Sequence, residues 1–116
     1  MSNQVMLIGR LVRDVEVKEL ENDNKVANIT LAVKRSYKNE NGIYECDFID
    51  CTLCNYLVDK AEWCRKGDLI GIRGRLQTRI VEKDDIKSKV MEVVVEKISF
   101  LSSGKGDVYN YESDRN

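Results

Sequence analysis

The stretch from Asp68 to Val81 carries residue types that can bind phosphate groups, and they recur at a fixed spacing. Because successive side chains on a β-strand point to opposite faces, the stretch divides into an apolar face and a polar, basic face. We expect the apolar face to enter a core, and it consists of Ile70, Ile72, Leu76 and Ile80. The outward face consists of Arg73, Arg75, Gln77 and Arg79. A row of guanidinium groups suits a chain of phosphates, although a solvated face with scattered ion pairs would show the same pattern.

The four cysteines, Cys46, Cys51, Cys54 and Cys64, have the spacing of a plant-type iron–sulfur site. Their context argues against one, because Cys51 has the opposite strand parity to Cys46 and Cys54. The outer two would lie roughly 26 Å apart on a strand. With no histidine in the chain, zinc would need all four thiols. We therefore expect reduced thiols and no metal, cluster or other cofactor, with a small metal or redox protein as an alternative of a different class.

Catalytic patterns are missing from the sequence. It has no histidine, no phosphate-binding glycine loop and no nucleophile with an adjacent base. Asp47 and Asp50 are three residues apart on a predicted strand, so their carboxylates would point to opposite faces. The sequence therefore predicts a binding protein and not an enzyme.

Length and composition indicate one domain with a polar end. The chain has 116 residues, of which 42% are hydrophobic, with 19 basic and 20 acidic groups. A net charge of −1 is unlike that of a strongly basic nucleic-acid binder, so a basic surface would have to be local. No apolar run is long enough to span a membrane, and the first residues do not resemble a signal peptide, so we expect a cytoplasmic protein without membrane contact. Residues 102–116 are polar and are expected to be disordered.

Alternation of apolar and polar residues predicts mostly strands. The predicted elements are a strand at Asn3–Val12 with a weaker continuation at Arg13–Leu20, strands at Lys25–Tyr37 and Ile43–Cys54, a helix at Asn55–Arg65, a strand at 68–81, a charged loop at Glu82–Lys89 and a strand at Val90–Leu101. Gly71 and Gly74 mark places where a strand bends or lies close to another backbone. Three strands, one short helix and two strands is the order of the OB-fold. We therefore predict an all-β class and a five-stranded Greek-key barrel over residues 1–101, of a kind that binds oligonucleotides.

Two aromatic residues bear on function. Phe48 falls among mostly polar residues on its strand, where it would serve as a stacking platform or lie tucked under a loop or against another subunit. Tyr37 has the parity of the core, so a bulge after Val33 would be needed to turn it outward. Trp63, by contrast, is expected to cap the core.

Several spaced motifs resemble the bacterial single-stranded DNA-binding protein family over residues 3–101. The first motif is N-x-V-x-L-x-G-R-L-x-x-D-x-E, which begins at Asn3. The others are V-A-N-I-T-L-A-V-K-R at Val26–Arg35, D-F-I-D-C at Asp47–Cys51, K-G-D-L-I-G-I-R-G-R-L-Q-T-R at Lys66–Arg79 and a valine-rich strand at Glu92–Glu96. Their order along the chain makes the resemblance specific.

The resemblance implies a protein that coats single-stranded DNA without sequence preference in replication, recombination and repair. It implies a homotetramer that pairs partly through its first strand. Tyr37 and Phe48 match the first two aromatic stacking positions of the family, whereas Cys54 and Val81 stand at the other two. Tyr44 or Tyr56 would have to replace the lost platforms, each worth about 1–3 kcal/mol per base. Phosphates would be neutralised by Lys34, Arg35, Arg73, Arg75 and Arg79.

The sequence also departs from the family. The acidic tip with a hydrophobic pair, through which the family recruits partner enzymes, has no counterpart in the ending Y-E-S-D-R-N. Either such recruitment is absent, or the protein is a specialised accessory or mobile-element member of the family, or the chain has been shortened. One alternative is a primosomal replication protein of the same fold, which binds single strands as a dimer. Another is an interaction module whose arginine face binds an acidic protein.

Overall fold

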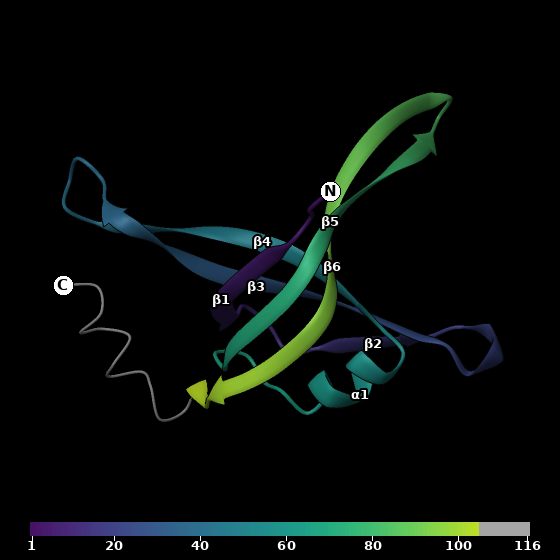
Figure 1. The fold of residues 1–116 in the computed structure, drawn as a ribbon, viewed down its shortest axis with the longest axis horizontal. Helices are drawn as coiled ribbons and strands as arrows, with labels where there is room; N and C mark the ends of the chain where they lie inside the picture. The colour runs from purple at the N-terminus through teal and green to yellow at the C-terminus, as the bar shows by residue number, and fades with distance from the viewer. Residues whose placement is uncertain (105–116) are drawn as a thin grey trace.

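The computed structural model of the protein describes residues 1–104, and Figure 1 shows their arrangement. The elements are β1 (Val5–Leu11), β2 (Glu16–Glu19), the 3-10 turn η1 (Glu21–Asp23), β3 (Lys25–Lys38), β4 (Tyr44–Cys54), α1 (Tyr56–Ala61), β5 (Leu69–Lys83) and β6 (Ile86–Ser102). The predicted order of strands and of a single short helix is confirmed. Most of the tail that we expected to be disordered, residues 105–116, lies outside the described residues.

The strands close into a barrel. Neighbouring strands follow the order β1-β5-β6-β4-β3, and β1 pairs again with β3 at Arg10–Ala32 and Leu11–Leu31. The β4–β6 contact is parallel and short, with Cys51 beside Val93. β2 pairs with β3 and continues the first strand after a break, as the weaker alternation had predicted. The structure is therefore the predicted five-stranded OB-fold barrel with its first strand divided in two.

Apolar residues of one strand parity fill the barrel, and α1 closes one end of it. Leu31, Leu53 and Ile70 are completely buried. The other members of the core are Leu11, Ala27, Ile29, Cys51, Leu57, Val58, Ala61, Cys64, Ile72, Val93 and Val95. Alternation in the sequence had placed Ile70 and Ile72 in this core, and both are there.

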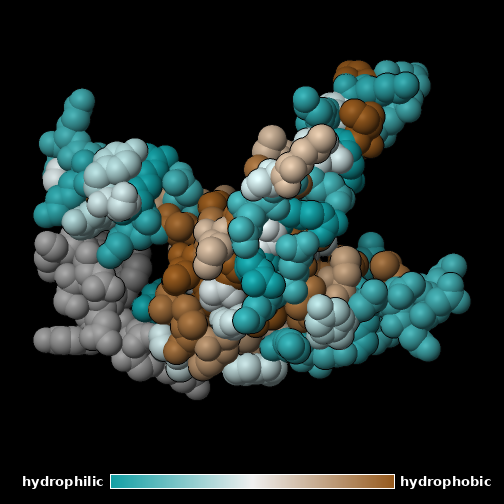
Figure 2. Space-filling model, viewed as in Figure 1, coloured by the Kyte–Doolittle hydropathy of each residue, from teal (hydrophilic) through white to brown (hydrophobic). Residues whose placement is uncertain are grey.

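Two pairs of strands extend beyond the barrel as two-stranded arms. In Figure 1 the β3–β4 arm runs to the left and the β5–β6 arm runs upward; Figure 2 shows that both project from the body of the molecule. Leu76 and Ile80, predicted as core residues, lie on the second arm and are 42% and 65% exposed. That prediction was wrong because the protein has no layer beneath this part of the ribbon.

The predicted loop at Glu82–Lys89 is also wrong. β5 continues to Lys83 and β6 begins at Ile86, so only Asp84 and Asp85 form the turn. Both have positive φ angles, 53° and 67°. Two such residues in succession match the twist of a tight hairpin, which the charged composition had concealed.

The helix is shorter than predicted, ending at Ala61 instead of Arg65. It buries Leu57, Val58 and Ala61, while Cys64 is buried in the turn that follows. Trp63 does not enter the core: it is 53% exposed, and its ring lies 5.0 Å from that of Phe100. Among residues 1–104, no helix is long and apolar enough to cross a membrane.

The buried residue Asp68 links segments from the start and the end of the barrel through hydrogen bonds. The sequence had not indicated this role. Asp68 is 7% exposed and accepts hydrogen bonds from the backbone N–H of Arg65 at 2.8 Å and of Gly104 at 2.9 Å. Its own carbonyl accepts from the N–H of Leu11. Asp68 therefore holds β1, the turn before β5 and the end of β6 together.

Gly71 and Gly74 differ in their surroundings. A Cβ at Gly74 would overlap the carbonyl oxygen of Val94, so β5 and β6 approach there more closely than any side chain would allow. The register shift between Arg73 and Gly74 lies at the same point. A Cβ at Gly71 would meet only the side chains of Leu101 and Ile8, at 3.5 Å and 3.8 Å. The predicted close approach is confirmed for Gly74 but not for Gly71.

Because of these surroundings, substitution by alanine should destabilise the protein at Gly74 but have little effect at Gly71. Gly74→Ala should lower the free energy of unfolding by about 1–3 kcal/mol, because the backbone of β6 must move. Gly71→Ala, the matched control, should change it by less than about 0.5 kcal/mol. Urea denaturation followed by circular dichroism measures both. Equal stabilities of the two variants would contradict the close approach at Gly74.

Candidate nucleic-acid interface

Four strands share one continuous solvent-facing surface, which we call the outer face. Residues paired directly across neighbouring strands point to the same side of a sheet. The register places Asn28 opposite Thr52, Thr52 beside Val94, and Val94 opposite Arg75. The outer face therefore runs across β3, β4, β6 and β5, and it connects the two arms.

Phe48 lies on the outer face and is open to solvent. It is 68% exposed and stands opposite the small side chain of Ala32. No loop within residues 1–104 covers the ring, in contrast to the alternative in which it lies tucked under a loop. An aromatic ring presented in this way offers a flat apolar surface on which a planar ligand can stack.

Basic and aromatic residues surround Phe48 on the same arm. Lys34 is paired with Cys46, two residues from Phe48, and Lys38 is paired with Tyr44. The two lysine ammonium groups lie 5.1 Å and 5.5 Å from the centroid of the Tyr44 ring. The arm therefore combines aromatic surface with positive charge, as a single nucleic-acid strand requires.

Tyr37 lies in an irregular part of β3. The pairing passes from Lys34–Cys46 to Lys38–Tyr44, so the three residues 35–37 oppose Glu45 alone. This bulge is the irregularity that the parity of Tyr37 required. The Tyr37 ring is 66% exposed, which leaves it available to a ligand.

The outer face also carries a cation that sequence reasoning missed. The Thr30 hydroxyl donates to Asp50 Oδ1 at 2.6 Å, and the Arg13 guanidinium donates to Thr30 Oγ1 at 3.1 Å. Arg13 comes from the segment between β1 and β2, far from this arm in sequence. Only the folded arrangement shows that its charge reaches the outer face.

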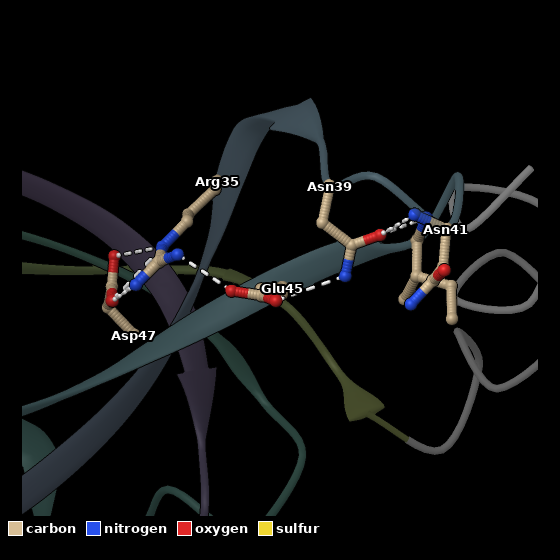
Figure 3. Close-up of polar contacts among 6 residues, drawn as sticks. Arg35, Asn39, Asn41, Glu45 and Asp47 are labelled. Carbon is tan, nitrogen blue, oxygen red and sulfur yellow. Dashed lines mark hydrogen bonds and ion pairs between the residues drawn. The ribbon is translucent and has the colours of Figure 1, made fainter.

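Arg35 lies on the opposite face of the arm from Phe48. Figure 3 shows its guanidinium held between Asp47, at 2.8 Å, and Glu45, at 2.7 Å. The hydrogen bonds to Asp47 raise the pKa of Arg35 further above its ordinary value, and they lower the pKa of Asp47. Glu45 also accepts from Asn39, whose side-chain oxygen accepts from backbone N–H groups of the hairpin loop. The structure thus places this predicted phosphate ligand in a chain of hydrogen bonds along the back of the arm.

The arginines of β5 occupy two different surroundings. Arg75 and Arg79 lie on the β5–β6 arm, 3.4 Å from Glu96 and 3.3 Å from Glu92 respectively. Arg73 instead lines a groove of about 450 Å³ on the surface formed by β1, β5 and β6. The groove is otherwise largely apolar and includes Met6, Ile8, Gly71, Lys97 and Leu101. The three arginines share a strand parity, as predicted, but not one site.

The remaining aromatic candidates lie near the end of β4. Cys54 is exposed on the outer face at one of the positions where the resemblance implies an aromatic residue. Tyr56 follows in the first turn of α1 and is 62% exposed, with Lys60 5.8 Å from its ring centroid. Val81, at the other lost position, is half-buried on the second arm.

The cysteines occupy separate environments. Cys51 and Cys64 are buried, Cys46 is half-buried and Cys54 is exposed, which confirms the opposite orientations predicted for the β4 thiols. Burial raises the pKa of Cys51 to about 11, with a further contribution from Asp50, and burial also raises the pKa of Cys64. Within residues 1–104, no group of three or more Cys, Asp or Glu side chains is placed to hold a metal ion.

Comparison with known proteins identifies the family. The model of the single-strand binding protein family matches residues 2–101. The chain belongs to this family. Single-stranded DNA-binding protein B of Bacillus subtilis is 41% identical over 103 residues, which cover 87% of this chain and 91% of that protein.

Two further relatives differ in length. The single-stranded DNA-binding protein of Streptococcus mutans is 38% identical, and the match covers 100% of this chain and 75% of that protein. The corresponding protein of Lactiplantibacillus plantarum is 42% identical, over 89% of this chain and 52% of its own length. The resemblance found in the sequence is thus confirmed, and these members of the single-strand binding protein family are named as binding proteins and not as enzymes.

The cysteine environments predict selective modification. At pH 8, a thiol reagent should label Cys54 rapidly and leave Cys51 unmodified, because the folded chain keeps the Cys51 proton up to about pH 11. Since the ordinary pKa is 9.0, the unfolded chain loses that proton first, and the contribution of Cys51 to stability falls between pH 9 and 11. Mass spectrometry of labelled peptides measures the selectivity. Equal labelling of Cys51 and Cys54 in the folded protein would contradict the described burial.

Proposed function

We propose that the protein binds and coats single-stranded DNA without sequence preference, using the outer face of the two arms. The observation that carries the proposal is Phe48, an aromatic ring 68% exposed beside basic residues in a member of the single-strand binding protein family. Bases of any identity have a flat face that can stack on such a ring. The duplex hides these faces within its own stack, so the proposal implies preference for the single strand.

Different residues stack on the bases and neutralise the phosphates. Bases stack on Phe48 and Tyr37, and Tyr44 lies beside them on the same arm. Phosphates meet Lys34, Arg75 and Arg79, together with Arg13. The phosphates release counterions when these side chains neutralise them, and the affinity therefore decreases as the salt concentration rises.

The remaining predicted contacts, Arg35, Arg73 and Tyr56, lie away from Phe48. Arg35 faces away from Phe48 and is paired with two carboxylates. Arg73 lines the groove on the β1 surface, so it would contact DNA only where a strand passes from one surface to the other. Tyr56 would extend the path of the strand towards α1, beyond the exposed Cys54.

Substitution of Phe48 tests the stacking. Phe48→Ala should weaken binding to a labelled oligo-dT by about 1–3 kcal/mol, measured by fluorescence anisotropy at low and moderate salt, because one base loses its platform. Phe48→Tyr keeps the ring and should bind like the unchanged protein. A same-length duplex serves as the second control. If Phe48→Ala and Phe48→Tyr bind with the same affinity, stacking on this residue is not the basis of binding.

We further propose that the protein acts as a homo-oligomer, most simply a homotetramer, that pairs through β1. Met6 and Ile8 are 75% and 61% exposed, and they border the apolar groove with Leu101. β1 pairs with β3 only at Arg10 and Leu11, so the earlier part of its second edge pairs with no strand within residues 1–104. A second copy would cover both the apolar surface and this edge.

A charge placed in this surface tests the assembly. Ile8→Lys should reduce the particle mass in light scattering, because an ammonium group would be buried between subunits. Ile86→Lys, at the tip of an arm and 67% exposed, is the matched control and should leave the mass unchanged. The unchanged protein should give four times 13.4 kDa, and a dimer would favour the primosomal alternative. An unchanged mass for Ile8→Lys would contradict pairing through β1.

The cellular setting follows from this activity. We propose a role in DNA replication, recombination and repair in the bacterial cytoplasm, where single strands arise. Nothing in the described residues favours an acidic protein over DNA as the ligand of the outer face.

A further inference from the structure

Carboxylates from β6 already hold the two arginines of the β5–β6 arm. Arg79 Nε lies 3.3 Å from Glu92 Oε1, and Arg75 Nη1 lies 3.4 Å from Glu96 Oε2. Both arginines are among the groups proposed above to meet phosphates. A phosphate that approaches the arm therefore finds each guanidinium with an anionic ligand in place.

The register explains why these pairs form. Glu92 stands directly opposite Gln77, so Arg75 and Arg79 are its diagonal neighbours on β5. Gln77 adds no positive charge, and its side-chain oxygen accepts a hydrogen bond from Arg75 at 3.1 Å. On the outer face of the arm, Arg75 and Arg79 therefore have carboxylate neighbours from β6.

The two members of the Arg79–Glu92 pair are not equally accessible. The Glu92 side chain is 19% exposed, whereas the Arg79 side chain is 57% exposed. The guanidinium can turn outward to a phosphate, but the carboxylate remains close beneath it. Glu92 thus opposes a bound phosphate in two ways, by competing for Arg79 and by repelling the added negative charge.

We propose that Glu92 and Glu96 are built-in competitors of the DNA backbone that set the affinity and the salt dependence of binding. This inference rests on the proposed function of the outer face. A phosphate that binds Arg79 or Arg75 must share the guanidinium with a glutamate or displace that glutamate. The displaced carboxylate then attracts a cation from solution, which offsets part of the counterion release that drives binding.

Removal of each carboxylate therefore has two measurable effects. Glu92→Gln and Glu96→Gln should each tighten binding to oligo-dT about two- to fivefold at low salt, and the double variant about tenfold, the range expected for exposed ion pairs. The decrease of log K with log salt concentration should become steeper by up to about 0.7 for each arginine released. Anisotropy titrations at four salt concentrations measure both quantities.

Glu82→Gln is the matched control. It removes the same charge from the same arm, but Glu82 pairs with Lys87 on the side opposite to Arg75 and Arg79. It should reproduce only the general effect of one fewer negative charge. Because glutamine has nearly the shape of glutamate, the arm should keep its structure, and the melting temperature of each variant checks this.

Arg79→Gln separates the inference from the proposed function. If Arg79→Gln weakens binding while Glu92→Gln and Glu96→Gln behave like Glu82→Gln, the arm binds DNA and the competitor role is wrong. If Arg79→Gln binds like the unchanged protein, Arg79 is not a phosphate ligand, and the inference is wrong at its premise. Tighter binding and a steeper salt dependence in both glutamine variants, relative to Glu82→Gln, would establish the competition.

Discussion

The structure depends on two places where backbones approach more closely than any Cβ would allow. At Gly9, a Cβ would lie 2.6 Å from the carbonyl oxygen of Ala32, where β1 crosses β3 and closes the barrel. At Gly74, β5 meets β6 at a register shift. Closure at these points brings β4 beside β6, and that contact joins the two arms into one outer face.

The arms account for both the binding surface and the exposed apolar residues. A two-stranded ribbon beyond the barrel has no layer to bury either of its sides. Phe48 is therefore open on the first arm, and Leu76 and Ile80 are open on the second. The first arm is also held by the hydrogen bonds of Arg35 along its back, which leaves the side with Phe48 free for ligands.

Alternation along the strands was sufficient to predict the barrel, because the parity of Ile70 and Ile72 determines which face is buried. Alternation failed to predict burial where a strand extends beyond the barrel: Ile80 has the parity of the core residues but is exposed. Alternation gives Arg35 the parity of Val33, and its guanidinium does lie on Asp47 and Glu45, on the side away from Phe48. Its grouping with the phosphate contacts did not follow from strand parity. Phe48 could be identified from the sequence because a large aromatic residue among polar neighbours on a strand is unusual.

Charged side chains were the least predictable part of the site. Arg13 reaches the outer face through Thr30, a residue that lies across the sheet and not nearby in sequence. The glutamate partners of Arg75 and Arg79 come from a strand whose register was unknown before folding. A row of arginines in a sequence therefore gives the position of the charges but not how many of them are available to DNA.

Cross-linking by ultraviolet light would show whether single-stranded DNA follows the outer face. The complex with oligo-dT would be irradiated and digested, and the modified residues would be identified by mass spectrometry. We predict cross-links at Phe48 and at Tyr37 or Tyr44, on the first arm. Cross-links confined to Trp63 and Phe100, the exposed aromatic pair beside α1, would contradict this prediction.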